Sequence, residues 1–341
     1  MPKMSRRQLI NAGLAAGALG AGLLPKPRAA YAAPEFSLKI GAELPASHSV
    51  IVWLNDAAKK IATETDGRVA IEILHSSVLG SAPELTSQVR AGAIDFTAVN
   101  SGSLTPIAPV AAVGSIGFSF KNHDQAWGAF DNELGDVVRA AFLKSGLLGF
   151  RNVWDQGFHQ ITTSKGPINN PVDFSGIKVR SPNMPIFISL FEGLGASPVA
   201  IPFGETYSAL QTKIADAQGQ ALSVMYSAKL YEVQKYLSLT RHIWTDIMLV
   251  ANARNFAKLP ASVQDTITKH INAAALVQRR ENVKSEEPIL ADLKAKGLII
   301  NETKPEPFRE RLNKSDYYPN WKKKIGDEAW SSLEKVVGKL G

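Results

Sequence analysis

Hydrophobic and polar residues follow two different periods in the first part of the chain beyond the N-terminal segment. Residues 36–44 place Phe36, Leu38 and Ile40 between polar neighbours, and this period of two indicates a β-strand. Residues 50–65 space their apolar side chains three and four positions apart, which predicts an amphipathic helix. This region is therefore expected to fold as a strand followed by a helix.

The same order of elements continues in the next part of the chain. Residues 68–74 and 93–99 are expected strands. Between them, Ser81 and Glu84 have the spacing of a capping box, so we expect a helix that begins there and ends at Gly92. Strands and helices that alternate with short connections predict an α/β fold, with a mostly parallel sheet covered by helices.

The second half of the chain alternates in the same way, with less regular spacing. We expect strands at residues 198–203 and 217–225, and helices at 204–216 and 231–237. Residues 262–284 contain neither glycine nor proline, which predicts a helix of about six turns. A helix of that length can join two lobes as a spine.

The first 32 residues have the pattern of an export signal. A basic start precedes an apolar run at residues 9–24, which is rich in glycine and alanine, and small residues in an A-x-A spacing follow. The pair Arg6-Arg7 resembles the twin-arginine type of bacterial signal. A membrane anchor is the alternative, but the run is shorter than the roughly 20 residues that a membrane helix needs. We expect cleavage near Ala32 or Ala33 and a mature protein in the periplasm.

Removal of the signal changes the charge of the protein. The whole chain has 38 Lys and Arg residues against 31 Asp and Glu residues, a net charge of +7. The signal holds five of the basic residues and no acidic one, so 33 basic residues remain against 31 acidic ones, a net charge of +2. A nearly neutral mature chain gives no reason to expect nucleic acid as a partner.

Sequence motifs of common catalytic sites are missing. The chain has no cysteine, which excludes disulfides and a thiol nucleophile. Its six histidines are scattered, without the spacing of a zinc site, and there is neither a G-x-S-x-G elbow nor a Walker loop. We therefore predict no metal, no cofactor and no enzymatic activity.

Four blocks of sequence carry a resemblance to a known family. They are GRVAIEILHSSVLGSAPELTSQVRAGAIDFT, FSGIKVRSP, LGASPVAIPFGETYSALQTKIADAQ and YSAKLYEVQKYLSLTRH. In order and spacing they resemble the periplasmic solute-binding proteins of TRAP transporters, the DctP family, over nearly all of the mature chain. The resemblance implies a two-lobed fold of the periplasmic-binding-protein type. Each lobe would be a mostly parallel sheet flanked by helices, and crossing strands and the long helix would join the lobes.

The resemblance also implies a division of the chain and a function. Residues 33–157 with 246–285 would form one lobe, and residues 158–245 with 286–341 the other. Proteins of this family bind a small organic acid between the lobes and deliver it to a membrane permease with a small and a large integral subunit. We expect a monomer that closes around its ligand, because the ligand contacts both lobes at once.

Arg180 has the clearest expected role. In the family, the arginine of the G-[IL]-K-[VIL]-R block binds the substrate carboxylate, and Arg180 occupies that place in GIKVR. A guanidinium matches a carboxylate with two parallel hydrogen bonds and stays charged at any relevant pH. Strand alternation alone favours the alternative, because it puts Arg180 on the same face as Lys178, as expected of a solvated cationic face.

The resemblance places further residues around the acid. His159 and Gln220 stand where many members have an arginine and an asparagine, and the single fixed cation that is left favours a monocarboxylate. Trp154 and Trp244 offer flat apolar walls that would suit an aromatic or branched acid. Core packing is the alternative for both tryptophans and for Phe203. The remaining candidates are, by position, Asn183, Phe203, Glu43 and Asn100.

Two other classes of protein share these features. A receptor that reports its ligand to a membrane sensor, without transport, would have the same sequence pattern, and neighbouring genes for a permease or a kinase distinguish the two. A periplasmic enzyme acting on a small carboxylate would need an acid, a base or a metal in the cleft. Turnover of a bound acid would reveal such an enzyme.

Overall fold

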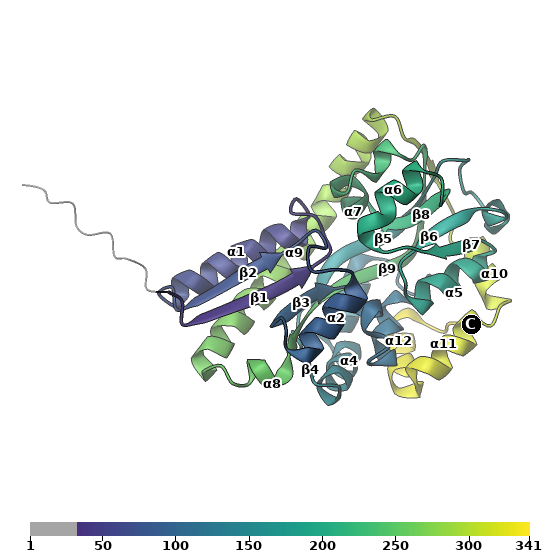
Figure 1. The fold of residues 1–341 in the computed structure, drawn as a ribbon. Helices are drawn as coiled ribbons and strands as arrows, with labels where there is room; N and C mark the ends of the chain where they lie inside the picture. The colour runs from purple at the N-terminus through teal and green to yellow at the C-terminus, as the bar shows by residue number, and fades with distance from the viewer. Residues whose placement is uncertain (1–32) are drawn as a thin grey trace, which may run out of the picture.

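The computed structural model describes residues 33–341, and the expected export signal at residues 1–32 lies outside the described residues. The protein is a two-lobed α/β protein, and Figure 1 shows the two lobes joined by long elements that run between them. Two strands, β5 (Trp154–Thr163) and β9 (Tyr236–Asn252), pair antiparallel where the lobes meet. The strand order is β2-β1-β3-β9-β5-β8-β6-β7, and β4 and β10 also pair with β9.

The first lobe contains the elements expected from the start of the mature chain. Its strands are β1 (Phe36–Ala42), β2 (Val69–Leu74), β3 (Phe96–Val99) and β4 (Leu147–Gly149). Its helices are α1 (Ser49–Glu64), α2 (Ala82–Ala91), α3 (His123–Asp131), α4 (Glu133–Lys144) and α8 (Ala253–Phe256). The predicted parallel pairing is confirmed for β1 with β2 and with β3. The Glu84 carboxylate also accepts from the backbone N–H of Ser81 at 2.7 Å, as the capping box predicts.

The second lobe departs from the expected elements in three places. Its strands are β6 (Lys178–Ser181), β7 (Ser197–Ala200), β8 (Ala217–Ala221) and β10 (Ile299–Glu302), and its helices are α5 (Pro185–Leu194), α6 (Thr206–Gln211) and α7 (Leu222–Ser227). The expected helix at 204–216 ends at Gln211, because Lys213 takes a positive φ of 63°. The strand at 217–225 stops at Ala221, and the helix at 231–237 is wrong, because β9 begins at Tyr236.

The expected spine helix is longer than its sequence predicts. It is α9 (Ala261–Ala295), which spans 35 residues and continues through Pro288. It packs against α1, β5 and α7, and in Figure 1 it runs from one lobe to the other. Within residues 33–341, this and every other helix is too short or too polar to cross a membrane.

Three helices at the C-terminus lie across both lobes. They are α10 (Glu306–Asn313), α11 (Tyr317–Ile325) and α12 (Asp327–Val337). Helix α12 packs against α3 and α4, whereas α10 and α11 pack against α5. The predicted lobe boundaries, which assign residues 286–341 to one lobe, stay a prediction, since these helices contact elements on both sides of the boundary.

Asp155, at the start of β5, is the centre of a buried polar network. Its side chain is fully buried, and Oδ1 accepts hydrogen bonds from His123 Nδ1 at 3.2 Å, Trp127 Nε1 at 3.0 Å and Trp244 Nε1 at 2.7 Å. Its Oδ2 accepts from Asn282 Nδ2 at 2.7 Å. Burial alone would raise the pKa of Asp155, but the hydrogen bond and charge of His123 hold the pKa below its ordinary value. The network ties α3, α9 and β9 to β5.

Asp246 is a second buried acid beside this network. It pairs with Asp155 across the ladder of β5 and β9, and its Oδ1 accepts from Ser101 Oγ at 2.6 Å. Its Oδ2 has no hydrogen-bond partner within residues 33–341. Burial raises the pKa of Asp246 to about 6.

The pKa of Asp246 predicts a pH dependence of stability. The folded state binds the proton of the Asp246 carboxyl group more tightly than the unfolded state does. The contribution of Asp246 to the free energy of unfolding is therefore complete below the ordinary pKa of 3.8 and is lost as the pH rises through about 6. Relative to Asp246→Asn, the wild-type free energy of unfolding should fall by up to about 3 kcal/mol over that range. Urea unfolding of both proteins at several pH values measures this. A constant difference between them would contradict the assignment.

Candidate functional site

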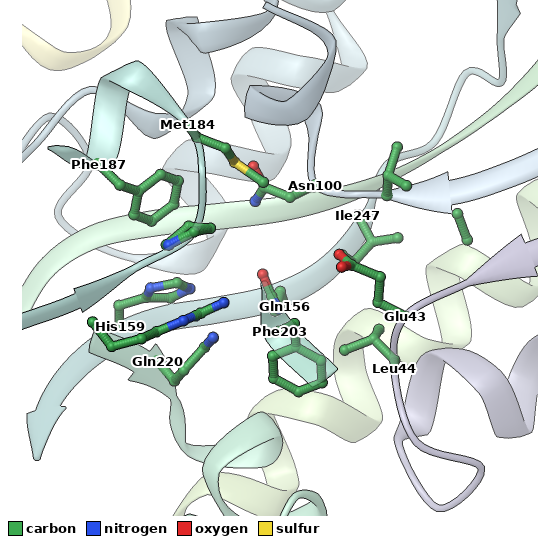
Figure 2. Close-up of a pocket in the computed structure, with 14 residues that line it drawn as sticks. Glu43, Leu44, Asn100, Gln156, His159, Met184, Phe187, Phe203, Gln220 and Ile247 are labelled. Atoms are coloured by element: carbon green, nitrogen blue, oxygen red, sulfur yellow. The ribbon is translucent and has the colours of Figure 1, made fainter. Parts of the chain in front are cut away.

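One cavity lies where strands of both lobes converge, and Figure 2 shows the side chains around it. The space between these side chains is about 480 Å³, part of which is open to solvent. The polar side chains of the lining are Glu43, Asn100, Gln156, His159, Arg180 and Gln220.

Strand ends place these polar groups. Glu43 follows β1 directly and Asn100 follows β3 directly, so both lie at the carboxyl ends of parallel strands. Arg180 and Gln220 lie near the carboxyl ends of β6 and β8, which are also parallel to each other. Open α/β sheets bind ligands at such ends. The two lobes therefore present polar groups to one cavity from opposite sides.

Arg180 is buried with its charged end unpaired. The residue is 1% exposed, and its Nε donates to the carbonyl oxygen of Ile201 at 2.9 Å. Neither Nη1 nor Nη2 has a hydrogen-bond partner within residues 33–341. Burial lowers the pKa of Arg180 to about 10, with Glu43 acting in the opposite direction, so the guanidinium stays charged at neutral pH. A buried cation without a partner is costly, and an anion in the cavity would remove that cost.

The expected alternative of a solvated face is wrong for Arg180. Lys178 is exposed, as alternation predicts, but Arg180 is buried one period later on the same strand. The difference arises because β6 pairs with β7 and β8 on its two sides and its carboxyl end faces the cavity. Burial at this position depends on the tertiary fold, which a period of two does not show.

His159 lines the cavity in its neutral form. It is 3% exposed, its Nε2 lies 2.9 Å from Thr245 Oγ1, and its Nδ1 has no partner in the described part of the chain. Burial, with smaller effects of His242 and Arg180, holds the pKa of His159 well below its ordinary value. The expectation that its charge varies near neutral pH is therefore wrong, and Arg180 is the only cationic side chain in the lining of this cavity.

Glu43, Gln220 and Asn100 complete the expected polar lining. Burial raises the pKa of Glu43, while the backbone N–H of Ala82 and the charge of Arg180 act to lower it. In Figure 2, Glu43 lies across the cavity from Gln220 and His159. Asn100 is engaged in its own lobe, because its Nδ2 donates to the Asp246 carbonyl at 3.1 Å.

Apolar side chains form the rest of the lining, and Phe203 is among them as expected. Sequence reasoning missed Met184 and Phe187, which lie at and after the N-cap of α5, and Ile247 of β9. It also missed Gln156, which lies at an irregularity in the pairing of β5 with β9. The segment SPNMPIF directly after Arg180 was the available signal for the first two. A β-bulge, which redirects a side chain, has no such signal here.

Three expected site residues lie elsewhere. Trp154 is fully buried in the hydrophobic core of the first lobe. Trp244 packs against Phe120 and Phe130, and its Nε1 donates to Asp155. Asn183 is exposed and does not line the cavity. For both tryptophans the structure therefore supports core packing, the alternative reading.

No metal site accompanies the cavity in the described residues. Within residues 33–341, no group of three or more His, Asp or Glu side chains is placed to hold a metal ion. The arrangement of the cavity consists of one buried cation, several uncharged polar groups, one carboxyl group and apolar walls. Such a cavity can bind a small anion with a carbon skeleton.

Comparison with known proteins identifies the family of this chain. Residues 40–323 match the profile described as bacterial extracellular solute-binding protein, family 7 (DctP). The chain is 31% identical over 277 residues to the 2,3-diketo-L-gulonate-binding periplasmic protein YiaO of Escherichia coli, which covers 81% of this chain and 84% of that protein. It is 28% identical to the sialic acid-binding periplasmic protein SiaP of Vibrio cholerae, over 79% of this chain and 83% of that one.

A solved structure shows the same fold. The sugar acid binding protein DctPAm from Advenella mimigardefordensis, in complex with galactonate, superimposes with a TM-score of 0.85. It is 27% identical, and the match covers 90% of this chain and 99% of that one. With the family profile spanning most of residues 33–341, the assignment rests on sequence and fold together. This protein belongs to the DctP family, family 7 of the bacterial extracellular solute-binding proteins.

Proposed function

We propose that this protein is the receptor of a TRAP-type transporter. It is exported by the segment at residues 1–32, is cleaved near Ala32 or Ala33, and works in the periplasm as a monomer. It binds one small organic acid between its lobes and delivers it to the small and large membrane subunits of the permease. The periplasmic relatives that bind 2,3-diketo-L-gulonate and sialic acid support this assignment.

The observation that carries the proposal is the unpaired guanidinium of Arg180. Its two terminal nitrogens lie at the cavity, buried and without partners in residues 33–341, and they match the two oxygens of a carboxylate. Because no other cation lines the cavity, the ligand carries one carboxylate in contact with Arg180. Glu43 faces the ligand from the first lobe, and Asn100, held by hydrogen bonds within that lobe, lines the same cavity, so binding favours the closed form.

A thermal-shift screen of the mature chain tests this function. The panel contains monocarboxylates, dicarboxylates, aromatic acids and sugar acids, each with its uncharged amide as a control. A ligand at 100 times its dissociation constant stabilises the folded state by about 2.7 kcal/mol, so we expect an acid to raise the unfolding midpoint and its amide to leave it unchanged. Equal shifts for an acid and its amide would contradict a carboxylate receptor.

A further inference from the structure

The hydrogen bonds behind His159 determine what this side chain offers to a ligand. The Thr245 hydroxyl has a single proton, which it donates to Gln156 Oε1 at 2.8 Å. The Gly157 carbonyl, 3.5 Å from the hydroxyl, is also only an acceptor. The hydroxyl must then accept at its 2.9 Å contact with His159 Nε2, so the proton of the neutral imidazole is on Nε2. The Nδ1 of His159 is left as an acceptor without a partner in the described structure. His159 therefore presents a lone pair, where a second arginine would present donors.

Glu43 adds a second acceptor on the opposite side of the cavity. Its carboxyl group lines the cavity across from His159, as Figure 2 shows. Burial raises the pKa of Glu43, whereas the N–H of Ala82 at the start of α2 and the charge of Arg180 act in the opposite direction and favour its ionised form. An ionised carboxylate accepts hydrogen bonds and repels a second anion. Gln220 does not discriminate, because its amide can both donate and accept.

We propose that the ligand is a hydroxylated monocarboxylic acid, such as a sugar acid of the aldonate type. This inference rests on the proposed function. The carboxylate of the ligand binds Arg180, and its hydroxyl groups donate to His159 Nδ1 and to the Glu43 carboxylate. Thr245 is a positioning residue that holds the imidazole in the accepting tautomer. An acid without hydroxyl groups would leave the buried Nδ1 of His159 unpaired and would not use the Glu43 carboxylate, and a diacid would bring a second negative charge towards Glu43.

Isothermal titration calorimetry with matched acids tests the ligand class. The probes are D-glycerate, L-threonate, D-gluconate and D-galactonate. Two other six-carbon acids serve as comparisons: hexanoate has no hydroxyl groups, and galactarate has a second carboxylate. We expect at least one aldonate to bind about 100-fold or more tightly than hexanoate and galactarate, because a site built for hydroxyl groups rejects analogues that leave its polar groups unpaired. A diacid, or an acid without hydroxyls, as the tightest ligand would overturn the proposal.

The same titrations separate this proposal from the proposed function. If galactarate or hexanoate binds most tightly and Arg180→Lys weakens that binding, the receptor function stands and the ligand class is wrong. If no carboxylate of any class binds, the receptor function itself fails. Weak, equal binding of all the acids would also overturn the hydroxyl-acid proposal, since it would show that neither acceptor contributes.

Glu43→Gln isolates the effect of the negative charge of Glu43 on ligand choice. The variant keeps the shape of the side chain and removes its charge, so the affinity ratio of galactonate to galactarate should fall at least about tenfold. Glu72→Gln is the matched control, because Glu72 is an exposed acid on β2 of the same lobe and does not line the cavity. An unchanged ratio in Glu43→Gln would contradict the role of Glu43.

Nitrogen NMR of the histidine rings tests the tautomer without any ligand. In the wild type, the signals of His159 should show a proton on Nε2 and none on Nδ1. The His159→Gln variant identifies these signals. Thr245→Val removes the acceptor that orients the ring, so the His159 signals should shift towards a mixture of tautomers. A proton on Nδ1 in the wild type would make His159 a donor and would overturn the proposal.

Discussion

Arg180→Met is expected to weaken the binding of the best acid by about 30- to 3,000-fold. Loss of one partner from a buried, hydrogen-bonded charge pair costs about 2 to 5 kcal/mol, and each 1.4 kcal/mol is a factor of ten in affinity. Calorimetric titration of the wild type and the variant with the same acid measures this loss. Lys178→Met is the matched control, because Lys178 is the exposed cation two residues earlier on β6, and it should keep wild-type affinity.

The same variant should not lose stability in the absence of ligand. In the described structure, the terminal nitrogens of Arg180 have no hydrogen-bond partners, so methionine removes a buried charge and takes a donor from one group only, the carbonyl oxygen of Ile201. Replacement of buried charged groups by apolar side chains of similar volume is often neutral or stabilising. Urea unfolding should therefore give Arg180→Met a free energy of unfolding equal to or above that of the wild type. Retained affinity, or lost affinity caused by unfolding, would contradict the role of Arg180 as a clamp.

Asp155→Asn is expected to lower the free energy of unfolding by about 3 to 5 kcal/mol. The amide replaces a carboxylate that accepts four hydrogen bonds, so an N–H group must face at least one donor. It also leaves the half-buried His123, whose pKa is raised to about 10 by Asp155 and Glu286 against the effect of burial, without its principal counter-charge. Removal of one partner of a buried pair has a cost of this size.

Urea unfolding at neutral pH measures the effect of Asp155→Asn. Asp265→Asn is the control, because Asp265 is an exposed acid on α9 and its replacement should change stability by no more than about 0.5 kcal/mol. A loss below about 1 kcal/mol in Asp155→Asn would show that the network on β5 does not hold the two lobes to the spine helix.

Local sequence signals predicted the first lobe well because they reflect local interactions. The capping box of Ser81 and Glu84 and the apolar stripe of α1 need only neighbouring residues, and both appear in the structure. The segment at 231–237 failed for the opposite reason. Its last residues join β9, where Tyr236 pairs with Thr163 and Ile299, which lie far away along the chain. Propensity is a weak guide where such distant pairing decides the structure.

Helix α9 shows a similar limit of prediction from local sequence. Pro288 removes a helical hydrogen bond and should end the helix. The residues beyond it include Ile289, Leu290 and Leu293, which belong to or pack against a hydrophobic cluster of the second lobe that contains Met225 and Leu298. Burial of these side chains offsets the loss at the proline. The pattern of the sequence marks the break but does not show the packing surface that overcomes it.

The candidate site could be predicted in part. The resemblance to the family led to Arg180 and five other lining residues, whereas strand alternation alone pointed Arg180 towards solvent. Trp154 and Trp244 were reasonable candidates for the walls of the cavity because of their size. Large aromatic residues stabilise a protein most when they are buried in its core, however, and both tryptophans are buried there. The tautomer of His159 could not be foreseen, because it depends on Thr245, a residue on the neighbouring strand.

A crystal structure of the mature protein with its tightest-binding acid tests the central claim most directly. The account predicts both carboxylate oxygens of the ligand within about 2.7 to 3.1 Å of Nη1 and Nη2 of Arg180, in the cavity between the lobes. The Nε of Arg180 should keep its bond to the carbonyl of Ile201. A ligand bound in this cavity with its carboxylate away from Arg180, or bound outside the cavity, would contradict the account.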